Sequence, residues 1–431
     1  MLFIAVLLML ASFFYPYFFW KKGKMFELGF SVAGSYFLML PGFFLVMSGV
    51  LPVPIDFFWT EIPKINFDIH KAEIILVLVF WLVVNQINVF LSAIKFKGNR
   101  LSRANLNDGV FIRIFFVYEA LSFLLFFASG LGSGGSHWSL GKEEFMKETG
   151  TLGLIFVFMV AGSRYAFVAL ATLSLFQEKK RLIACLTLIV CSITDLYMTG
   201  NRITMLLVLF CFMYYLLKNK EYKIIGIGCL VALPFGWFMV IFRFIRSQLH
   251  SESSVLEGFS KGLDVASGML DFNSGVVFEF MSGISESVNF NVLIGVYTRY
   301  GSGVDYLSGS SYWKALVWWV PRSLYEGKPE TITLEVAKVF APHEHVSLVA
   351  TALGESFANF GYFSAVLLPF ILFGFRSIVE KLYVSERYCD FVKLVYGFLL
   401  FRMAFSDLFV YMIFGGLLVI ALNFKFRFYA H

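Results

Sequence analysis

The chain has 431 residues, of which 59% are hydrophobic and only 15% are charged, and its mean hydropathy is +0.77. Soluble chains are about 45–50% apolar and about 25% charged, so this composition excludes a soluble, disordered or fibrous protein. Its continuous apolar runs also exclude a single-pass anchor and an outer-membrane barrel, whose strands would alternate apolar and polar residues. The formal net charge of +6 indicates no nucleic-acid partner, because in a protein with many spans the position of the Lys and Arg residues matters more.

Because a bilayer span needs roughly 20 apolar residues, the sequence predicts an all-α, polytopic integral membrane protein with about eleven transmembrane helices. In chain order, we expect the spans at 2–20, 27–50, 73–94, 110–132, 151–176, 182–199, 203–217, 224–242, 346–375, 391–406 and 408–424. The first run lacks a basic start and an A-x-A-like cleavage site, so we interpret it as a retained span. The five cysteines show neither a disulfide framework nor a C-x-x-C spacing.

The distribution of positive charge orients these spans. Nineteen Lys and Arg residues, among them Lys24, Lys220 and Arg376, lie in alternate loops and in the C-terminal tail, against five in the short loops of the other face. The positive-inside rule therefore places the N-terminus outside and the C-terminus in the cytoplasm. Three regions follow: spans one to eight over residues 1–242, a large outer loop over 243–345, and spans nine to eleven with the tail over 346–431. In the loop, SYWKALVWWV at 311–320 predicts a short helix on the bilayer surface.

Charged side chains inside spans cost about 2.5–3.5 kcal/mol each, so they mark candidate sites. Arg164 and Glu119 lie near the middle of two successive antiparallel spans, which predicts an ion pair that locks two helices. Alternatively, Arg164 lines a polar cavity for an anionic ligand. We expect Asn85, Gln86 and Asn88 to make polar helix–helix contacts. Near the outer ends of spans, a further set of charged residues either borders a site or reaches water: Asp195, Arg202, Arg402 and Asp407.

Arg243 and Arg246 directly follow the eighth predicted span and share one helix face if that helix continues. Because Arg binds phosphate bidentately, this pair predicts a phosphate or diphosphate site at the outer interface, with ordinary interfacial placement as the alternative. His343 and His345 form an H-E-H sequence, but no third ligand is near in sequence, so we expect no metal. No D-x-D sequence, phosphate-binding loop or nucleophile elbow is present.

Two stretches carry a family resemblance: WKALVWWVPRSLYEGKPETI at 313–332 and VSLVATALGESFANFGYFSAVLLPFILFG at 346–374. They resemble the bacterial O-antigen polymerases (Wzy), also called oligosaccharide repeat unit polymerases. Those proteins often carry a P-R-S-x-W-P-x-K-P-like segment in a long periplasmic loop, followed by G-E-x-x-x-N-F-G-Y at the outer end of a span. The sequence departs from the first pattern at residues 324–327, and Gly200-Asn201-Arg202 is similar to the family's G-(S/N)-R helix opening.

The resemblance implies a metal-independent membrane glycosyltransferase of the GT-C type, without a cofactor, in the bacterial inner membrane. It would transfer a growing glycan from undecaprenyl diphosphate to a new lipid-linked repeat unit at the periplasmic face, with surface-polysaccharide or lipopolysaccharide biosynthesis as its role. Its partners would be the two lipid-linked oligosaccharides and membrane lipids. Whether a separate protein regulates the chain length is left open.

For catalysis, the resemblance and the charge pattern favour Glu355 as a base or sugar ligand and Arg322 as a diphosphate ligand. The expected substrate-binding residues are Arg243, Arg246, Lys328, Arg202, Arg299, Arg402, Arg164, Asn359 and Tyr362. Two alternatives stay open: an O-antigen ligase-like transferase and a lipid-linked oligosaccharide flippase or transporter. The long outer loop and the absence of inverted repeats argue against the transporter.

Overall fold

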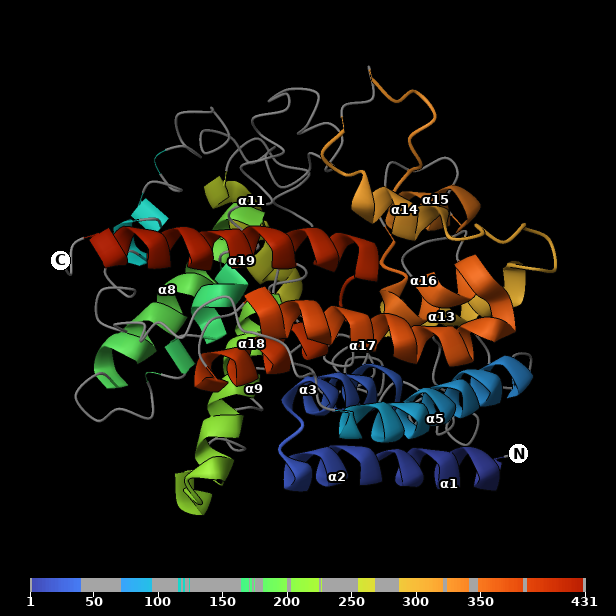
Figure 1. Ribbon diagram of the computed structural model, residues 1–431, viewed down its shortest axis with the longest axis horizontal. Helices are drawn as coiled ribbons and strands as arrows, with labels where there is room; N and C mark the ends of the chain where they lie inside the picture. Colours follow the sequence, from blue (N-terminus) through green and yellow to red (C-terminus); the bar gives the residue numbers. More distant parts are fainter. Residues whose placement is uncertain are drawn as a thin grey trace. The chain divides into compact units, whose positions relative to one another are not determined.

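The computed structural model describes residues 2–39, 71–94, 181–199, 203–224, 255–267, 287–320, 324–340, 348–382 and 386–428, with short pieces between 115 and 174 and residue 226. Throughout these residues the regular secondary structure is helical, so the all-α class is confirmed (Figure 1). The predicted spans at 110–132, 151–176 and 224–242 fall mostly outside them. The chain divides into two compact units, which are described separately below.

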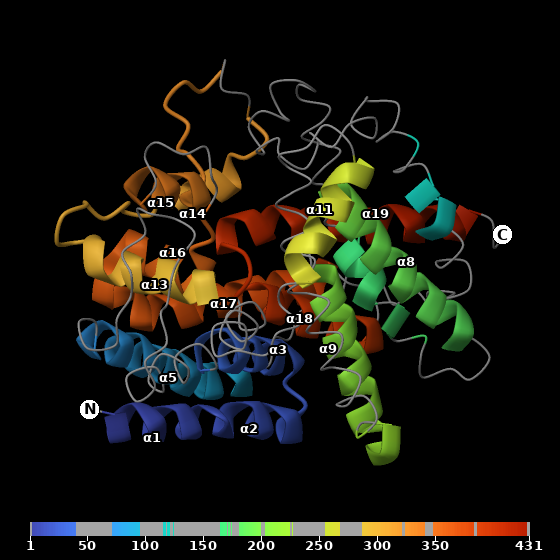
Figure 2. The ribbon, with the colours of Figure 1, turned by 180° about the vertical axis from the view of Figure 1, so that it is seen from behind.

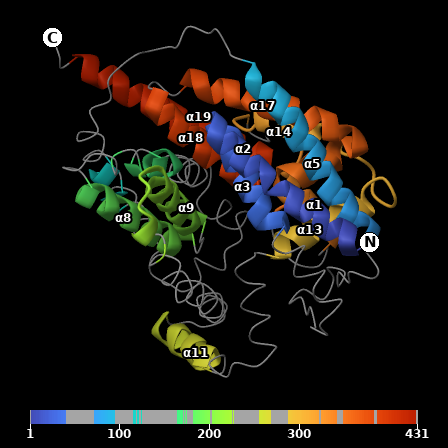
Figure 3. The ribbon, with the colours of Figure 1, turned by 90° about the horizontal axis from the view of Figure 1, so that it is seen from below.

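The first unit contains Met1–Leu101, Ser285–Val384 and Lys393–Ile413. Its N-terminal helices are α1 (Leu2–Ser12), α2 (Phe14–Lys22), α3 (Met25–Gly34), the π-helix η1 (Ser35–Met39) and α5 (Lys71–Ala93). The first predicted span is therefore two helices, because Pro16 has no N–H to donate to the carbonyl of Ser12. The helix pair α1–α2 lies alongside α5 (Figure 3), and Tyr15 Oη donates to the carbonyl of Leu82 at 3.3 Å.

The later part of this unit holds α13 (Ser287–Arg299), α14 (Ser310–Leu316), α15 (Ile332–Phe340), α16 (Thr351–Phe360), the 3-10 turn η5 (Gly361–Phe363) and α17 (Ser364–Leu382). The surface helix predicted over 311–320 thus ends at Leu316. The span predicted over 346–375 is interrupted at Gly361, whose φ of 55° lies in the left-handed region that favours glycine.

Helices α18 (Glu386–Leu399) and α19 (Phe405–Phe428) complete the described part of the C-terminus. We expected the turn between them at 406–407, and this prediction was wrong by a few residues. A turn forms earlier, where the amides of Arg402 and Met403 both donate to the carbonyl of Leu399 at 2.8 and 2.9 Å. The carbonyl of Leu400 is occupied by the amide of Ala352 at 2.9 Å, so contact with α16 helps to fix the place where α18 ends.

Two glycines allow α3 and α18 to cross at short distance in the first unit. A Cβ at Gly29 on α3 would collide with the backbone carbonyl of Leu394 on α18, and a Cβ at Gly397 would collide with the carbonyl of Phe26. Small residues at such a crossing let two backbones approach, which is the usual way that apolar helices pack in lipid. Beside this crossing, the rings of Phe30, Trp81 and Phe401 form a buried aromatic cluster with centroids 4.8–5.0 Å apart.

Three helix ends that the charge pattern assigns to the same membrane face lie together in the first unit. Arg376 on α17 forms an ion pair with Glu27 on α3, and its second terminal nitrogen donates to the carbonyls of Leu91 and Ile94 at 3.3 and 3.4 Å. Lys24, before α3, donates to the carbonyl of Ser92. The tertiary structure thus brings together three helix ends that the distribution of positive charge had assigned to one face.

In the second unit, α8 (Arg181–Thr199) packs directly on α9 (Ile203–Lys218), and α11 (Val255–Ser267) is also described (Figure 2). Among the described residues of the whole chain, two helical stretches are long and apolar enough to cross a membrane, Ala72–Ala93 and Thr351–Leu382. Ile203–Lys218 and Phe405–Leu417 are shorter apolar helices. These two stretches do not test the predicted number of eleven spans, which stays a prediction.

Candidate active site around Glu355

Glu355 lies at the centre of α16, a helix that is enclosed by the rest of the first unit. Every residue from Thr351 to Asn359 is buried, and Glu355 itself is 0% exposed. Gly354 permits this close packing, because a Cβ there would lie 3.1 Å from Leu293 on α13. A carboxylate in such a place needs hydrogen-bond donors, since burying an unpaired charge is costly.

Two donors from distant parts of the chain reach the Glu355 carboxylate. Ser311 Oγ, on α14 in the predicted outer loop, donates to Oε1 at 2.7 Å. The backbone N–H of Ser406, at the start of α19, donates to Oε2 at 3.1 Å. Glu355 therefore joins α14, α16 and α19 at one buried point. A carboxylate has about four accepting positions, so these two donors leave about half of its capacity.

Asn359, one turn further along α16, completes the cluster. Its Nδ2 donates to Ser311 Oγ at 2.8 Å and to the carbonyl of Glu355 at 2.7 Å, while its Oδ1 accepts the amide of Gly309 at 3.0 Å. The loop before α14 also binds the end of α16, because the amides of Leu307 and Ser308 donate to the carbonyls of Ala358 and Asn359. Asn359 and Glu355 thus fix the same loop by side-chain contacts.

Two further hydroxyl groups belong to this cluster. Tyr312 follows Ser311, and its ring lies 5.6 Å from that of Phe360 and 5.4 Å from that of Phe405. The residue is partly exposed, but its hydroxyl oxygen is buried. Within the described part of the chain, Tyr312 Oη has no hydrogen-bond partner, whereas the Ser406 side chain interacts with the Glu355 carboxylate. Burial raises the pKa of the Tyr312 phenol well above its ordinary value, and the nearby Glu355 carboxylate raises it further, so this hydroxyl stays protonated.

The predicted cations divide into several groups. Lys328 is 9% exposed, and its Nζ donates to the carbonyls of Trp318 and Val320 at 2.7 and 2.6 Å. These bonds tie the segment around Lys328 back to the residues that follow α14. Arg299 is exposed at the end of α13, and Arg402 is partly buried in the turn between α18 and α19. The remaining predicted phosphate ligands lie outside the described residues: Arg202, Arg243, Arg246 and Arg322.

Tyr362 lies just after α16, on η5. It is 64% exposed, and its ring meets that of Phe357 edge-on at 5.4 Å. Phe363 beside it is 65% exposed. An open aromatic pair at this point is available either to a sugar ring or to lipid.

Arg164 lies in the second unit, in a different group of charges. Its Nε and one terminal nitrogen donate to the two carboxylate oxygens of Glu119 at 3.1 and 3.3 Å, and its other terminal nitrogen donates to Asp195 Oδ1 at 3.0 Å. Thr204 Oγ1 donates to Asp195 Oδ2 at 2.7 Å. The predicted ion pair with Glu119 is therefore present, and the sequence did not indicate that Asp195 would join it. Because Arg164 is 0% exposed, this arrangement favours a structural ion pair that holds helices together over a cavity for an anionic ligand.

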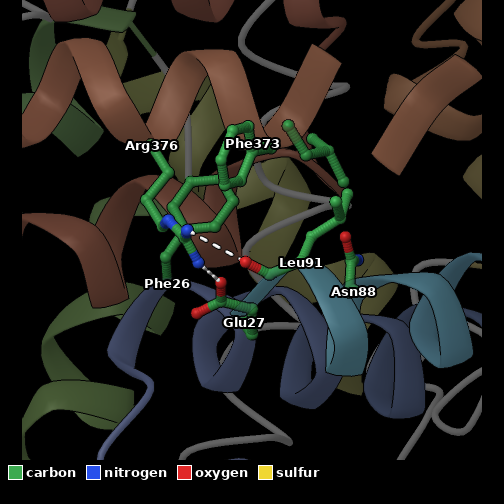
Figure 4. A pocket seen from close by; sticks show the side chains of 7 residues that line it. Phe26, Glu27, Asn88, Leu91, Phe373 and Arg376 are labelled. Atoms are coloured by element: carbon green, nitrogen blue, oxygen red, sulfur yellow. Dashed lines mark hydrogen bonds and ion pairs between the residues drawn. The ribbon is translucent and has the colours of Figure 1, made fainter. Parts of the chain in front are cut away.

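A pocket lies at the Arg376–Glu27 pair (Figure 4). It is lined by Phe26, Glu27, Asn88, Leu91, Leu372, Phe373 and Arg376. The guanidinium of Arg376 crosses it toward Glu27 and the carbonyl of Leu91. We predicted Arg376 only as one of the basic residues that orient the loops, because nothing local in the sequence indicates a partner 349 residues away.

Within the described residues, no group of three or more His, Cys, Asp or Glu side chains is placed to hold a metal ion, and His343 and His345 lie outside those residues. Comparisons of the chain with protein-family models, with curated proteins and with solved structures found no match.

Proposed function

We propose that the protein is a polytopic inner-membrane glycosyltransferase with about eleven spans that polymerises lipid-linked oligosaccharide repeat units at the outer face of the membrane. The growing glycan is transferred from undecaprenyl diphosphate to the hydroxyl of a new lipid-linked unit. The proposal rests on the composition, the resemblance of residues 313–332 and 346–374, and the contacts of Glu355.

The predicted alternation of the spans is supported by contacts that join three helix ends. Lys24 and Arg376 belong to the basic set that the positive-inside rule assigns to the cytoplasm. The same two residues make the contacts that join the start of α3, the end of α5 and the later part of α17. Two helix ends with opposite orientations would not meet in this way across a bilayer.

The observation that carries the proposal is the bond between the outer loop and the buried carboxylate. A transporter gains little from a loop of about one hundred residues, whereas an enzyme needs fixed side chains where its lipid-linked substrates arrive. Here the loop helix α14 is held on α16 by Ser311, Glu355 and Asn359. The same loop contains Arg322 and Lys328 from the first of the two familiar stretches.

The proposed chemistry assigns a role to each type of group. The acceptor hydroxyl oxygen attacks the anomeric carbon of the donor, and the bond from that carbon to the diphosphate oxygen breaks, leaving its electron pair on the diphosphate. Arg322, with Arg243 and Arg246, stabilises the charge that develops on the leaving diphosphate. Glu355, whose carboxylate keeps accepting capacity, orients the acceptor hydroxyl and takes its proton.

The decisive experiment uses the purified full chain in liposomes with undecaprenyl-diphosphate-linked repeat unit as the only substrate. We expect oligosaccharides of increasing length to form without any nucleotide. An absence of chain growth by folded protein would contradict the proposal. Transport of the lipid-linked unit across the bilayer without growth would select the flippase alternative.

A deletion strain separates the polymerase from the ligase-like alternative. Loss of a polymerase leaves a single repeat unit on the final acceptor, whereas loss of a ligase leaves long polymer on undecaprenyl diphosphate. The length of the glycan on each lipid therefore decides between them.

A further inference from the structure

The buried cluster around Glu355 contains more hydrogen-bonding capacity than its own contacts use. The carboxylate accepts two hydrogen bonds, from Ser311 Oγ and from Ser406 N, out of about four that its oxygens can accept. Tyr312 Oη is buried and has no partner among the described residues, whereas the buried Ser406 hydroxyl lies beside the Glu355 carboxylate and interacts with it. A buried hydroxyl without a partner is uncommon in folded proteins, since burial takes away its hydrogen bonds to water.

These groups lie close together. Ser406 is 3% exposed, and its own amide binds the Glu355 carboxylate. Tyr312 follows the residue whose hydroxyl binds the other oxygen of that carboxylate. The Tyr312 ring packs between Phe360, which follows Asn359, and Phe405, which precedes Ser406. Two hydroxyl groups and a carboxylate with spare lone pairs thus come from three different segments of the chain.

We propose that Tyr312 Oη, Ser406 Oγ and the Glu355 carboxylate together bind hydroxyl groups of a sugar in the lipid-linked acceptor. This inference rests on the proposed function and adds two binding residues to it. A sugar carries adjacent hydroxyl groups, each of which can donate and accept a hydrogen bond. These groups match the two protein hydroxyls, of Tyr312 and Ser406, and the accepting carboxylate of Glu355. The Tyr312 ring and the rings of Phe360 and Phe405 supply the flat apolar surface against which a sugar ring packs.

Entry of a sugar requires a local movement, because Glu355 is fully buried under α14. This helix has seven residues and is held to the carboxylate by Ser311 Oγ. When α14 moves away from α16, a sugar hydroxyl replaces the Ser311 hydroxyl on Glu355 Oε1. Tyr312 moves with the same helix and contacts the sugar from the loop side.

The test measures binding and stability in the same variants. In Tyr312→Phe and Ser406→Ala, we expect the Kd for undecaprenyl-diphosphate-linked repeat unit to rise about 5- to 10-fold, as for the loss of one hydrogen bond. The melting temperature of Tyr312→Phe should stay unchanged or rise, because the hydroxyl that is removed has no partner among the described residues. A group with a purely structural role would show the opposite pattern, with lower stability and an unchanged Kd.

Two matched variants serve as controls. Tyr300→Phe removes another buried hydroxyl without a partner among the described residues, at the end of α13, where the phenol lies beside Glu335. Ser356→Ala removes a buried hydroxyl on α16 that donates to the carbonyl of Leu353 at 2.9 Å. We expect both to leave the Kd unchanged.

The outcomes separate this inference from the proposed function. Chain growth by the wild type with an unchanged Kd in both Tyr312→Phe and Ser406→Ala overturns the sugar site and leaves the polymerase standing. Binding without chain growth overturns the polymerase, while a Kd that rises only in these two variants still supports the sugar site. A wild-type protein that neither binds nor extends the repeat unit overturns both.

Discussion

Ser311 and Glu355 are separated by 44 residues in sequence and joined by a buried hydrogen bond of 2.7 Å between Ser311 Oγ and Glu355 Oε1. This bond connects the predicted outer loop to the helix that contains the proposed catalytic carboxylate. Because Asn359 also donates to Ser311 Oγ, one hydroxyl links two residues of the G-E-x-x-x-N sequence. The spacing of four residues in that sequence places both side chains on one face of α16.

Glu355→Gln should abolish long-chain product while the protein still folds. The amide has nearly the same size and one remaining acceptor, but it cannot take a proton from the acceptor hydroxyl. We expect the rate of chain growth to fall by about 10²- to 10⁴-fold, as for the loss of a general base. The measurement is the glycan ladder on gels and the initial rate in liposomes, with Ser356→Ala as control. A normal ladder from Glu355→Gln at equal protein level would remove Glu355 from the chemistry.

Arg376→Ala should destabilise the first unit strongly. The Arg376 and Glu27 side chains are 6% and 7% exposed, and removal of one partner leaves the other buried charge without its counter-ion. Such losses cost about 3–5 kcal/mol. The free energy of unfolding in detergent micelles, followed by circular dichroism, measures the effect.

Two variants control for this prediction. Lys338→Ala breaks the ion pair between Lys338 and Glu335. Because the Lys338 side chain is 61% exposed, we expect this variant to change the free energy of unfolding little. The double variant Glu27→Gln/Arg376→Met removes both buried charges and should recover much of the loss. Equal stability of Arg376→Ala and the wild type would contradict the arrangement of α3, α5 and α17.

Gly29→Ala and Gly397→Ala should each weaken the crossing of α3 and α18. The added Cβ meets a backbone carbonyl, which cannot move aside as the end of a flexible side chain does. We expect a loss of about 1–3 kcal/mol in the free energy of unfolding, as for other overpacked sites. Gly374→Ala on α17 is the matched control, because its Cβ enters open space and a glycine in a helix is destabilising relative to alanine. Stability that falls equally in all three variants would argue against the crossing.

The predicted orientation can be tested by labelling single cysteines in a chain whose own cysteines are replaced. Ser302→Cys lies in an exposed turn of the predicted outer loop, and Lys220→Cys lies in an exposed turn after α9 on the predicted inner side. A membrane-impermeant maleimide should label Ser302→Cys in intact cells. Lys220→Cys should react only after the membrane is opened. The reverse pattern would invert the orientation and place Glu355 on the wrong side for the proposed reaction.

Several features followed from local sequence alone. Continuous apolar runs predicted helices, and the described helices α5, α8 and α9 begin and end within two residues of the predicted spans. The spacing of Glu119 and Arg164 in successive runs predicted an ion pair, which is present. Hydropathy and helical period act over a few turns, so they can be read without knowledge of the fold.

Breaks within the apolar runs were harder to place. The interruption at Gly361 and the turn at 400–404 both lie within predicted spans, and contacts with loop residues and with α16 fix them. The Tyr306 ring packs against Gly361 and leaves no room for a Cβ there. This contact between residues far apart in sequence cannot be predicted from local sequence.

Local patterns were enough to predict a helical, strongly apolar chain with its positive charge in alternate loops, and the family resemblance pointed to Glu355 and Asn359. The contacts of these residues follow from the packing of distant segments. This packing joined Glu355 to Ser311 and Ser406, Arg376 to Glu27, and Arg164 to Asp195. The physical reason is that burial forces polar groups to pair, and the available partner depends on which distant segments pack together.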